Sequence, residues 1–384
     1  MPEIFRTPGV YIQETGKTSK AIVGVSTSTA VLIGTFPTGP KYIATTVRSL
    51  QECERIFGGL RNNQLSSLVL KQFLENGGKE IWVLSTGVKF SRAASLLLKG
   101  LSLVVSQIPS FNMLLIPETT LLPDREAAKV FQAAVPVIEK HRAVYLLDPP
   151  QQDALRQTVR DLAAWFRAQS GIRHPSLILY HPRIQVRSQV ASPPTVTIPA
   201  SGTMAGLFAR FDEARGVWKA PAGTEATLQG VVGLEQLLTS QDIALLTPAN
   251  INALKLIPPS TYVAWGSRTL SSDPEWKYVP VRRMALFLES SIAQGTTWAV
   301  FEPNNEPLWA QIRQSVEVFM QALFRQGAFQ GLRLQDAYFV KCGRETTTMP
   351  EQAAGNVNIV VGFAPLKPAE FIILTVKQKA RPVS

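Results

Sequence analysis

Residues 30–35 read AVLIGT and residues 80–85 read EIWVLS, and these two stretches decide the fold. Both are almost entirely apolar instead of alternating between apolar and polar residues, which predicts strands covered on both faces. The same pattern recurs further along the chain, at residues 112–116 (NMLLI), 143–147 (AVYLL) and 177–180 (LILY). Such strands are typical of a parallel sheet, because helices cover both of its faces.

Helical patterns lie between these strands. Residues 64–76 carry apolar side chains at helical spacing and end at Gly77-Gly78, which is typical of a helix C-terminus. Residues 153–169 predict a second amphipathic helix. Strand, helix and strand in this order predict an α/β fold, with a mostly parallel sheet and helices on both faces. Residues 183–203 are rich in Pro and Ser, and they predict a long surface loop that interrupts this order.

The character of the sequence changes from residue 266 onward and predicts an α+β C-terminal domain. Residues 284–292 are apolar and predict a helix, and residues 298–301 (WAVF) predict a strand. Asn304 or Asn305 can then cap a helix that has Pro307 in its first turn. Apolar side chains recur at helical spacing from residue 308 to 324, and we expect this stripe to be core.

Both ends of the chain predict short strands joined to the rest by hinges. Near the N-terminus the strand residues are followed by a polar linker, residues 15–20, which contains Gly16. Near the C-terminus the strand follows a hinge, residues 364–368, which contains Pro365 and Pro368. The predicted strand residues are Val10, Tyr11, Ile12, Gln13 and Glu14 at one end and Phe371, Ile372, Ile373, Leu374, Thr375 and Val376 at the other.

The amino-acid composition limits the classes of function and partner that suit this chain. The 384 residues contain 45% hydrophobic and 17% charged residues, as in an ordinary globular protein. The formal net charge is +11, but no run of four basic residues and no nucleic-acid recognition motif occurs, so an acidic protein surface is a better partner than nucleic acid. We expect no signal peptide and no membrane insertion, and Cys53 and Cys342 predict buried structural thiols.

Catalytic constellations are missing from the sequence. The three histidines, His141, His174 and His181, have no metal-ligand spacing, and no nucleophile elbow, P-loop or glycine-rich phosphate loop occurs. Asp148 follows a buried strand, where α/β enzymes often keep a carboxylate, but without a partner it predicts a helix-capping or loop residue. We therefore expect no catalytic residue, no metal and no cofactor. An α/β enzyme is the rival hypothesis, and it would need one of these histidines as its base.

A set of motifs in order along the chain resembles the contractile tail sheath proteins of phages and phage-like injection systems. It opens with TPGVY (7–11) and GVSTSTA (24–30), and it continues with FGG (57–59), NGG (76–78), YLLDPP (145–150) and RGVWKAP (215–221). The resemblance is strongest in WGSRTLSSDPEWKYVPVRR (265–283), VFEPNNEPLW (300–309), YFVKCGRETTT (338–348) and PAEFIILTV (368–376). The residues that carry the family motif are Trp218, Lys219, Asp273, Pro274, Trp276, Glu302, Pro303, Asn304 and Lys341.

The resemblance implies a structural subunit instead of an enzyme. It implies an N-terminal arm (1–20), a body (21–265) arranged like subtilisin without its catalytic residues, an inner sheath domain (266–366) and a C-terminal strand arm (367–384). It further implies hexameric rings that stack around an inner tube, exchange terminal strands between subunits, and contract to drive the tube through a target envelope.

The partners implied are further copies of the chain, an inner tube protein with an acidic outer surface, and baseplate and tail-terminator proteins. The resemblance also implies assembly in the cytoplasm and action in a virion tail or in a released or anchored injection particle. The short 183–203 segment departs from longer family members, which favours the compact sheath of an injection system or tailocin. A sheath-like paralogue that caps the tail at the baseplate or terminus is the alternative.

Overall fold

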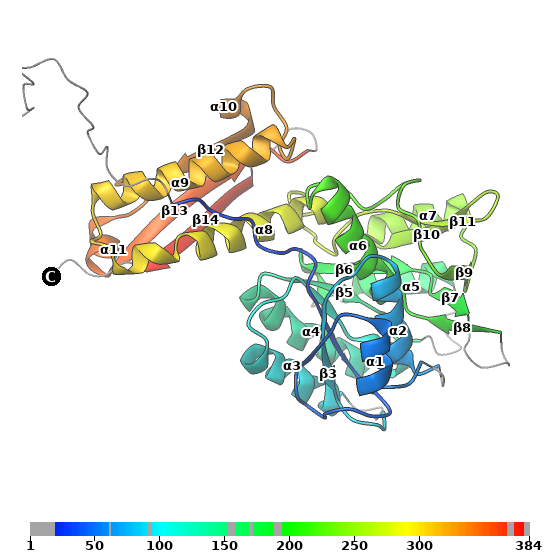
Figure 1. The fold of residues 1–384 in the computed structure, drawn as a ribbon. Coiled ribbons are helices and arrows are strands. Elements are labelled where there is room, and N and C mark those ends of the chain that lie inside the picture. Colours follow the sequence, from blue (N-terminus) through cyan, green and yellow to red (C-terminus); the bar gives the residue numbers. More distant parts are fainter. Residues whose placement is uncertain are drawn as a thin grey trace, which may run out of the picture.

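The computed structural model describes residues 20–60, 63–90, 94–151, 158–168, 172–187, 194–366 and 372–379. Figure 1 shows a rounded body and an elongated C-terminal domain, and helix α8 (Val279–Gly295) runs from one to the other. The predicted arm at residues 10–14 lies outside the described residues, as do Gly16, Pro368 and Phe371. The predicted division of the chain at residue 266 remains a prediction.

An eight-stranded sheet forms the centre of the body, in the order β11-β10-β6-β5-β4-β1-β3-β2. Its inner strands pair in parallel, and the edge strands β2 and β11 pair antiparallel. The predicted strands are confirmed to within one residue at each end. The strands are β1 (Ala30–Gly34), β2 (Thr45–Val47), β3 (Ile81–Ser85), β4 (Met113–Leu115), β5 (Val144–Leu147), β6 (Leu177–His181), β10 (Asn252–Ile257) and β11 (Thr261–Trp265).

Helices cover both faces of this sheet, as the all-apolar strands require. Ala30 and Leu32 of β1 pack into one core cluster, and Val31 and Ile33 pack into the other, because successive side chains leave a strand on opposite faces. The first cluster lies against α1 (Leu50–Ile56), α2 (Leu65–Glu75) and α6 (Ser201–Arg215). The second lies against α3 (Ser95–Gln107), α4 (Asp124–Lys140), α5 (Val159–Ala168) and α7 (Ser240–Leu246).

The prediction of one long surface loop at residues 183–203 is wrong. The segment contains β7 (Ile184–Arg187) and β8 (Thr195–Ile198), and α6 begins at Ser201. With β9 (Val231–Leu234) these strands form a second sheet in the order β8-β7-β9. The Pro and Ser residues concealed two four-residue strands, because strands this short gain their stability from pairing and little from their own propensity.

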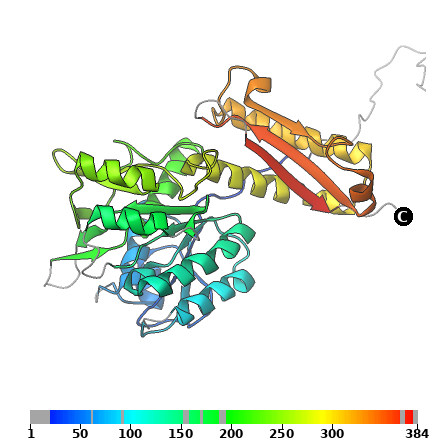
Figure 2. The same cartoon turned by 180° about the vertical axis from the view of Figure 1, so that it is seen from behind.

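The C-terminal domain packs two helices on one face of a small sheet. The 3-10 helix η4 (Thr297–Phe301) follows α8. The helices after it are α9 (Glu306–Arg325), α10 (Leu334–Ala337) and α11 (Met349–Ala353). The sheet has the order β12-β13-β14, with β12 (Tyr338–Lys341), β13 (Asn356–Phe363) and β14 (Ile372–Lys379). Figure 2 shows β13 and β14 in front of α8 and α9. A third core cluster fills the space between the helices and β13, and it includes Trp309, Phe319, Ile359 and Phe363.

The predicted strand at residues 298–301 is wrong, because this segment forms η4. Its backbone bonds are local: Ala299 N–H donates to Thr296 O at 3.0 Å, and Glu302 N–H donates to Ala299 O at 3.1 Å. The helix predicted for residues 284–292 is longer than expected, since Pro280 in its first turn is compatible with helix. Among the described residues, no helix is both long enough and apolar enough to cross a membrane.

Candidate functional site

Open α/β sheets bind ligands at the carboxyl ends of the strands where the strand order reverses, which here lies between β1 and β4. Glu118, in the 3-10 helix η1 (Pro117–Leu121) after β4, is fully buried at this place. Its carboxyl accepts hydrogen bonds from Thr35 N–H at 2.6 Å, from the Thr35 hydroxyl at 3.0 Å and from the Ser66 hydroxyl. Burial raises the pKa of the Glu118 carboxyl.

Gly34, the last residue of β1, allows these groups to approach. A Cβ at this position would lie 2.1 Å from Ser66 Oγ and 2.6 Å from Glu118 Oε2, closer than real atoms come. The side chains of Ser66 and Glu118 therefore fill the space beside the end of β1.

Asp148 and the three histidines do not form one site. Asp148 is buried after β5, and burial raises the pKa of its carboxyl to about 8. His181 ends β6, where burial lowers its pKa to about 4. His174 Nε2 lies 3.0 Å from Glu139 Oε1, and the ring of His141 stacks on Phe111 with centroids 4.8 Å apart. Among the described residues no group of three or more His, Cys, Asp or Glu could hold a metal.

Asn304 anchors the turn that begins α9. Its amide nitrogen donates to Gln352 O at 3.1 Å and to Asn356 O at 3.0 Å, and its oxygen accepts from Trp309 Nε1 at 2.8 Å. Of the two predicted caps, Asn305 is the residue that accepts from Leu308 N–H. Asn304 is instead a completely buried joint between α9, α11 and β13.

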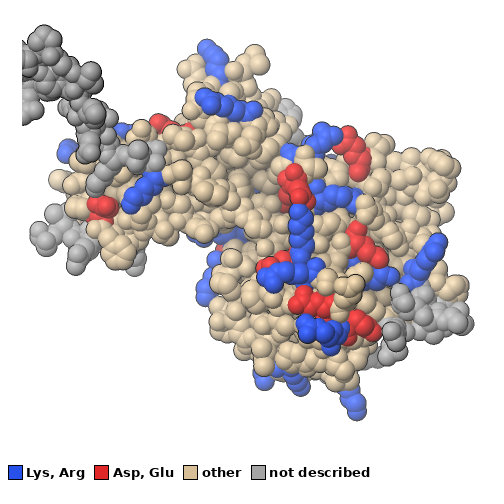
Figure 3. Space-filling view, in the orientation of Figure 1, with Lys and Arg blue, Asp and Glu red and all other residues tan. Residues whose placement is uncertain are grey.

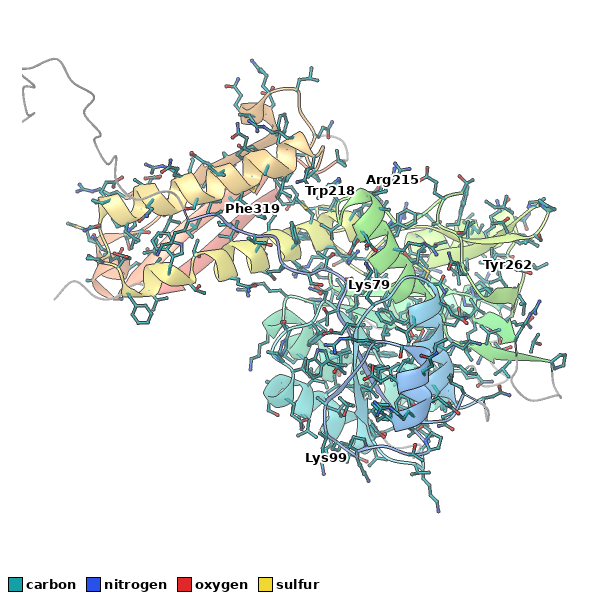
Figure 4. The ribbon with its side chains drawn as sticks, in the orientation of Figure 1. Lys79, Lys99, Arg215, Trp218, Tyr262 and Phe319 are labelled. Atoms are coloured by element: carbon teal, nitrogen blue, oxygen red, sulfur yellow. The ribbon has the colours of Figure 1, made fainter. Side chains whose placement is uncertain are left out.

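The other motif residues lie in two places. Trp218 packs against the third core cluster where the end of α6 approaches α8 (Figure 4), and Lys219 lines a groove beside Pro365. Asp273 and Pro274 belong to the turn before α8, and the ring of Trp276 lies under the Arg282 guanidinium at 5.1 Å. Glu302 and Pro303 line a second groove, at the start of α9, and Lys341 is exposed at the end of β12.

A buried ion pair that the sequence analysis did not single out joins the body to α8. Arg283 makes two hydrogen bonds to Asp212 of α6, at 2.8 and 2.6 Å, and a third to Thr27 O at 3.0 Å. The Thr27 hydroxyl completes the network by donating to Asp212 at 2.6 Å. Both charged side chains are almost fully buried, with exposed fractions of 4% and 6%. Each buried charge therefore lies beside a partner of opposite sign and is also hydrogen-bonded, as a stable buried ion pair requires.

The predicted C-terminal strand lies on the described chain as β14, which extends to Lys379 instead of ending at Val376. It pairs antiparallel with β13 of the same chain, from Ile372 opposite Phe363 to Lys379 opposite Asn356. β14 is at the edge of its sheet. Lys377 and Lys379 lie within the strand.

The first and last described residues lie at the same end of the C-terminal domain. Lys20, the first described residue, has its ammonium 4.7 Å from the centroid of Trp298 in η4. The last residues of β14 pair with the start of β13, beside the Asn304 joint. Figure 1 shows this end of the domain, marked by α11, pointing away from the body.

Comparisons with known proteins bear on the sheath resemblance. Residues 271–379 match the family model of the phage tail sheath C-terminal domain. A protein described as a prophage major tail sheath protein, from Pseudomonas aeruginosa strain UCBPP-PA14, is 28% identical over 260 residues, which is 66% of this chain. The match spans 63% of that relative's length.

Two solved assemblies are similar over nearly the whole chain. The helical sheath of the anti-feeding prophage in its contracted state has a TM-score of 0.75 and 27% identity, covering 97% of this chain and 99% of that one. The contracted sheath complex of an extracellular contractile injection system, PVC, has a TM-score of 0.73 and 26% identity, covering 97% and 98%. The expected resemblance is thus confirmed: residues 271–379 match the phage tail sheath C-terminal domain, and the chain is similar over nearly its whole length to the sheath proteins of contractile injection systems.

Proposed function

We propose that this chain is a structural subunit that polymerises as stacked hexameric rings around an inner tube. The sheath contracts from a metastable extended state and drives the tube through a target envelope. The observation that carries the proposal is β14, an edge strand held to β13 by a backbone ladder over its whole length. Its connection to β13 includes Pro365 and Pro368.

The edge position of β14 supports strand exchange between copies. A strand held by main-chain hydrogen bonds keeps the same bonds when an identical strand of a neighbouring copy replaces it, so the exchange costs little. The segment before Ile372 then acts as the hinge. By the same argument residues 10–14 are a second donated strand, with a hinge at Gly16.

Contraction needs no nucleotide in this proposal. A metastable sheath requires only that the contracted state bury more interface per subunit, and that gain is multiplied over many copies. The close packing of the buried Glu118 and the buried ion pair of Arg283 favour a body that moves as a rigid unit. The further partners are an inner tube with an acidic outer surface, a baseplate and a tail terminator. We expect assembly in the cytoplasm and action in a virion tail or an injection particle.

Negative-stain electron microscopy of the purified chain, beside a variant that lacks residues 1–20, tests the proposal. We expect long hollow tubes from the intact chain and none from the truncated one. Short capped assemblies of the intact chain would favour the terminal paralogue. Monomers from both proteins at high concentration, also in the presence of an inner tube protein, would rule out the sheath role.

A further inference from the structure

The two ends of α9 carry surfaces of opposite kind. At the C-terminal end, the loop before α10 exposes Leu332 almost completely, at 98%, beside Arg333 and near Arg325, the last residue of α9. We call Arg325, Leu332 and Arg333 the knob. Leu334 adds a further apolar side chain that is 39% exposed. Figure 3 shows Lys and Arg side chains over this end of the domain, near α10 in Figure 1.

The knob is built on a fixed loop. Gly331 adopts φ of 120°, which suits glycine, and a Cβ there would lie 3.1 Å from the Asp336 backbone. Arg333 makes two hydrogen bonds to the Asp336 carboxylate, at 2.8 and 3.0 Å. Before the turn, Gln330 N–H donates to Ala364 O at 2.9 Å. The loop that exposes Leu332 is therefore held in place on both sides.

The other end of α9 carries a groove of about 580 Å³. Its apolar wall includes Pro303, Pro307 and Leu308, and the side chain of Phe301 next to it is 82% exposed. Glu302 also lines it, and Glu306 is exposed in the first turn of α9. Three uncharged polar side chains line the groove as well. A partly apolar groove with acidic groups at its edge is complementary to a knob that carries an apolar side chain and the cation of Arg325.

One chain cannot join its own knob to its own groove. α9 has 20 residues, so its ends are roughly 30 Å apart at 1.5 Å per residue. We propose that the knob of one copy docks in the groove of the next copy. A contact between two different surfaces of identical chains is heterologous, and it generates a ring or a helix instead of a closed dimer. This inference rests on the proposed function and adds a second contact to strand exchange.

The exposed Leu332 carries the inference more than the charges do. Glu306 and Arg325 also suit the helix dipole of α9, because acidic groups favour the N-terminal end and basic groups the C-terminal end. That effect explains the two charges within one chain. Docking on a second copy also buries the side chain of Leu332, which the helix dipole does not affect.

Cross-linking tests the contact. The full-length variant Leu332→Cys/Ala310→Cys places one thiol on the knob and one in the groove, while Cys53 and Cys342 are buried. Oxidation of the assembled protein should give a ladder of dimers, trimers and larger multimers on a denaturing gel. Leu332→Cys/Val88→Cys, with Val88 exposed in the body, is the matched control and should give no ladder. An equal ladder from both variants, or none from the first, overturns the knob-and-groove contact.

Charge reversal gives an independent readout. Arg325→Glu and Glu306→Arg should each raise the protein concentration needed for assembly by about tenfold, and the double variant should restore it, since both sides of each contact are then reversed. Equal, additive losses without rescue would overturn the contact. Hollow tubes with no ladder and no rescue would refute this contact but not strand exchange. A chain that never multimerises would refute both this contact and the proposed function.

Discussion

The ion pair between Arg283 and Asp212 fixes the direction in which the C-terminal domain leaves the body. Arg283 lies on α8 and Asp212 on α6, and the same guanidinium holds the backbone of Thr27. The guanidinium also stacks over the ring of Phe208, 4.9 Å from its centroid. Three segments distant in sequence thus meet at one charged group, so a single substitution acts on the whole joint.

Breaking this pair should cost far more than breaking an exposed one. We expect Asp212→Ala to lower the free energy of unfolding by about 3–5 kcal/mol, because it leaves the Arg283 charge buried without its partner. Lys79→Ala, which removes an exposed pair with Glu213, should change it by less than about 1 kcal/mol. Urea unfolding of the unassembled protein measures both. Equal effects of the two substitutions would show that the buried pair contributes no more than a surface one.

Asp148 predicts how stability depends on pH. Burial raises the pKa of the Asp148 carboxyl from its ordinary 3.8 to about 8, so its contribution to stability is fully present below about pH 3.8 and is lost as the pH rises to about 8. His181 acts in the opposite direction: burial lowers its pKa from 6.5 to about 4, so its contribution is present above about pH 6.5 and is lost as pH falls to about 4.

We therefore expect the urea concentration at the midpoint of unfolding to decrease as the pH rises from 6.5 to 8. Asp148→Asn should flatten this fall, because the amide carries no proton that ionises. His181→Gln is the control, and it should leave the alkaline fall unchanged while altering the acidic limb below pH 6.5. An alkaline fall of equal size in Asp148→Asn would assign it to other groups.

At the scale of elements, β14 is the strand on which the proposed strand exchange acts. Val360 of β13 lies directly opposite Thr375 of β14. Cysteines at directly opposite positions of an antiparallel pair are close enough to form a disulfide. A disulfide at these two positions would hold β14 on β13.

Oxidising Val360→Cys/Thr375→Cys before assembly should prevent tube formation, because the strand can no longer leave its own sheet. Reduction should restore the tubes, and Thr375→Cys alone should assemble normally. Oxidation after assembly should instead join different chains, which a denaturing gel detects. Normal tubes from the fully locked monomer would contradict strand exchange through β14.

At the scale of the whole molecule, net charge and shape are the features that matter. The formal charge of +11 is spread over the surface, and Figure 3 shows positive and negative groups interleaved on the visible face of the body. The C-terminal domain extends from the body along α8, so it presents α9 and the edge of the β12-β13-β14 sheet to other molecules.

An acidic inner tube should bind this chain in a salt-dependent manner. We expect co-sedimentation with tubes to weaken as salt rises from about 50 to 500 mM, because charges beyond the Debye length are screened. Lys341→Glu, at an exposed position of β12 in the C-terminal domain, should loosen the binding, with the exposed Lys99→Glu in the body as the control. Binding that does not respond to salt would contradict an electrostatic contact with the tube.

The sequence by itself determined the central sheet, because strands buried on both faces must be apolar throughout, and β1, β3, β4, β5 and β6 each show that pattern. It also determined α9, whose apolar stripe and capping asparagine are local signals. Its ordered motifs further indicated the sheath family. None of these features depends on a distant partner.

Only the tertiary structure decided the features that depend on residues far apart in the chain. It assigned the cap to Asn305 and the buried joint to Asn304, since the choice depends on Trp309 and on backbone oxygens about 50 residues away. It turned the expected loop at 183–203 into two strands by pairing β7 with β8 and β9. It also brought Arg283 to Asp212, 71 residues apart, because a buried charge is stable only where folding delivers its partner.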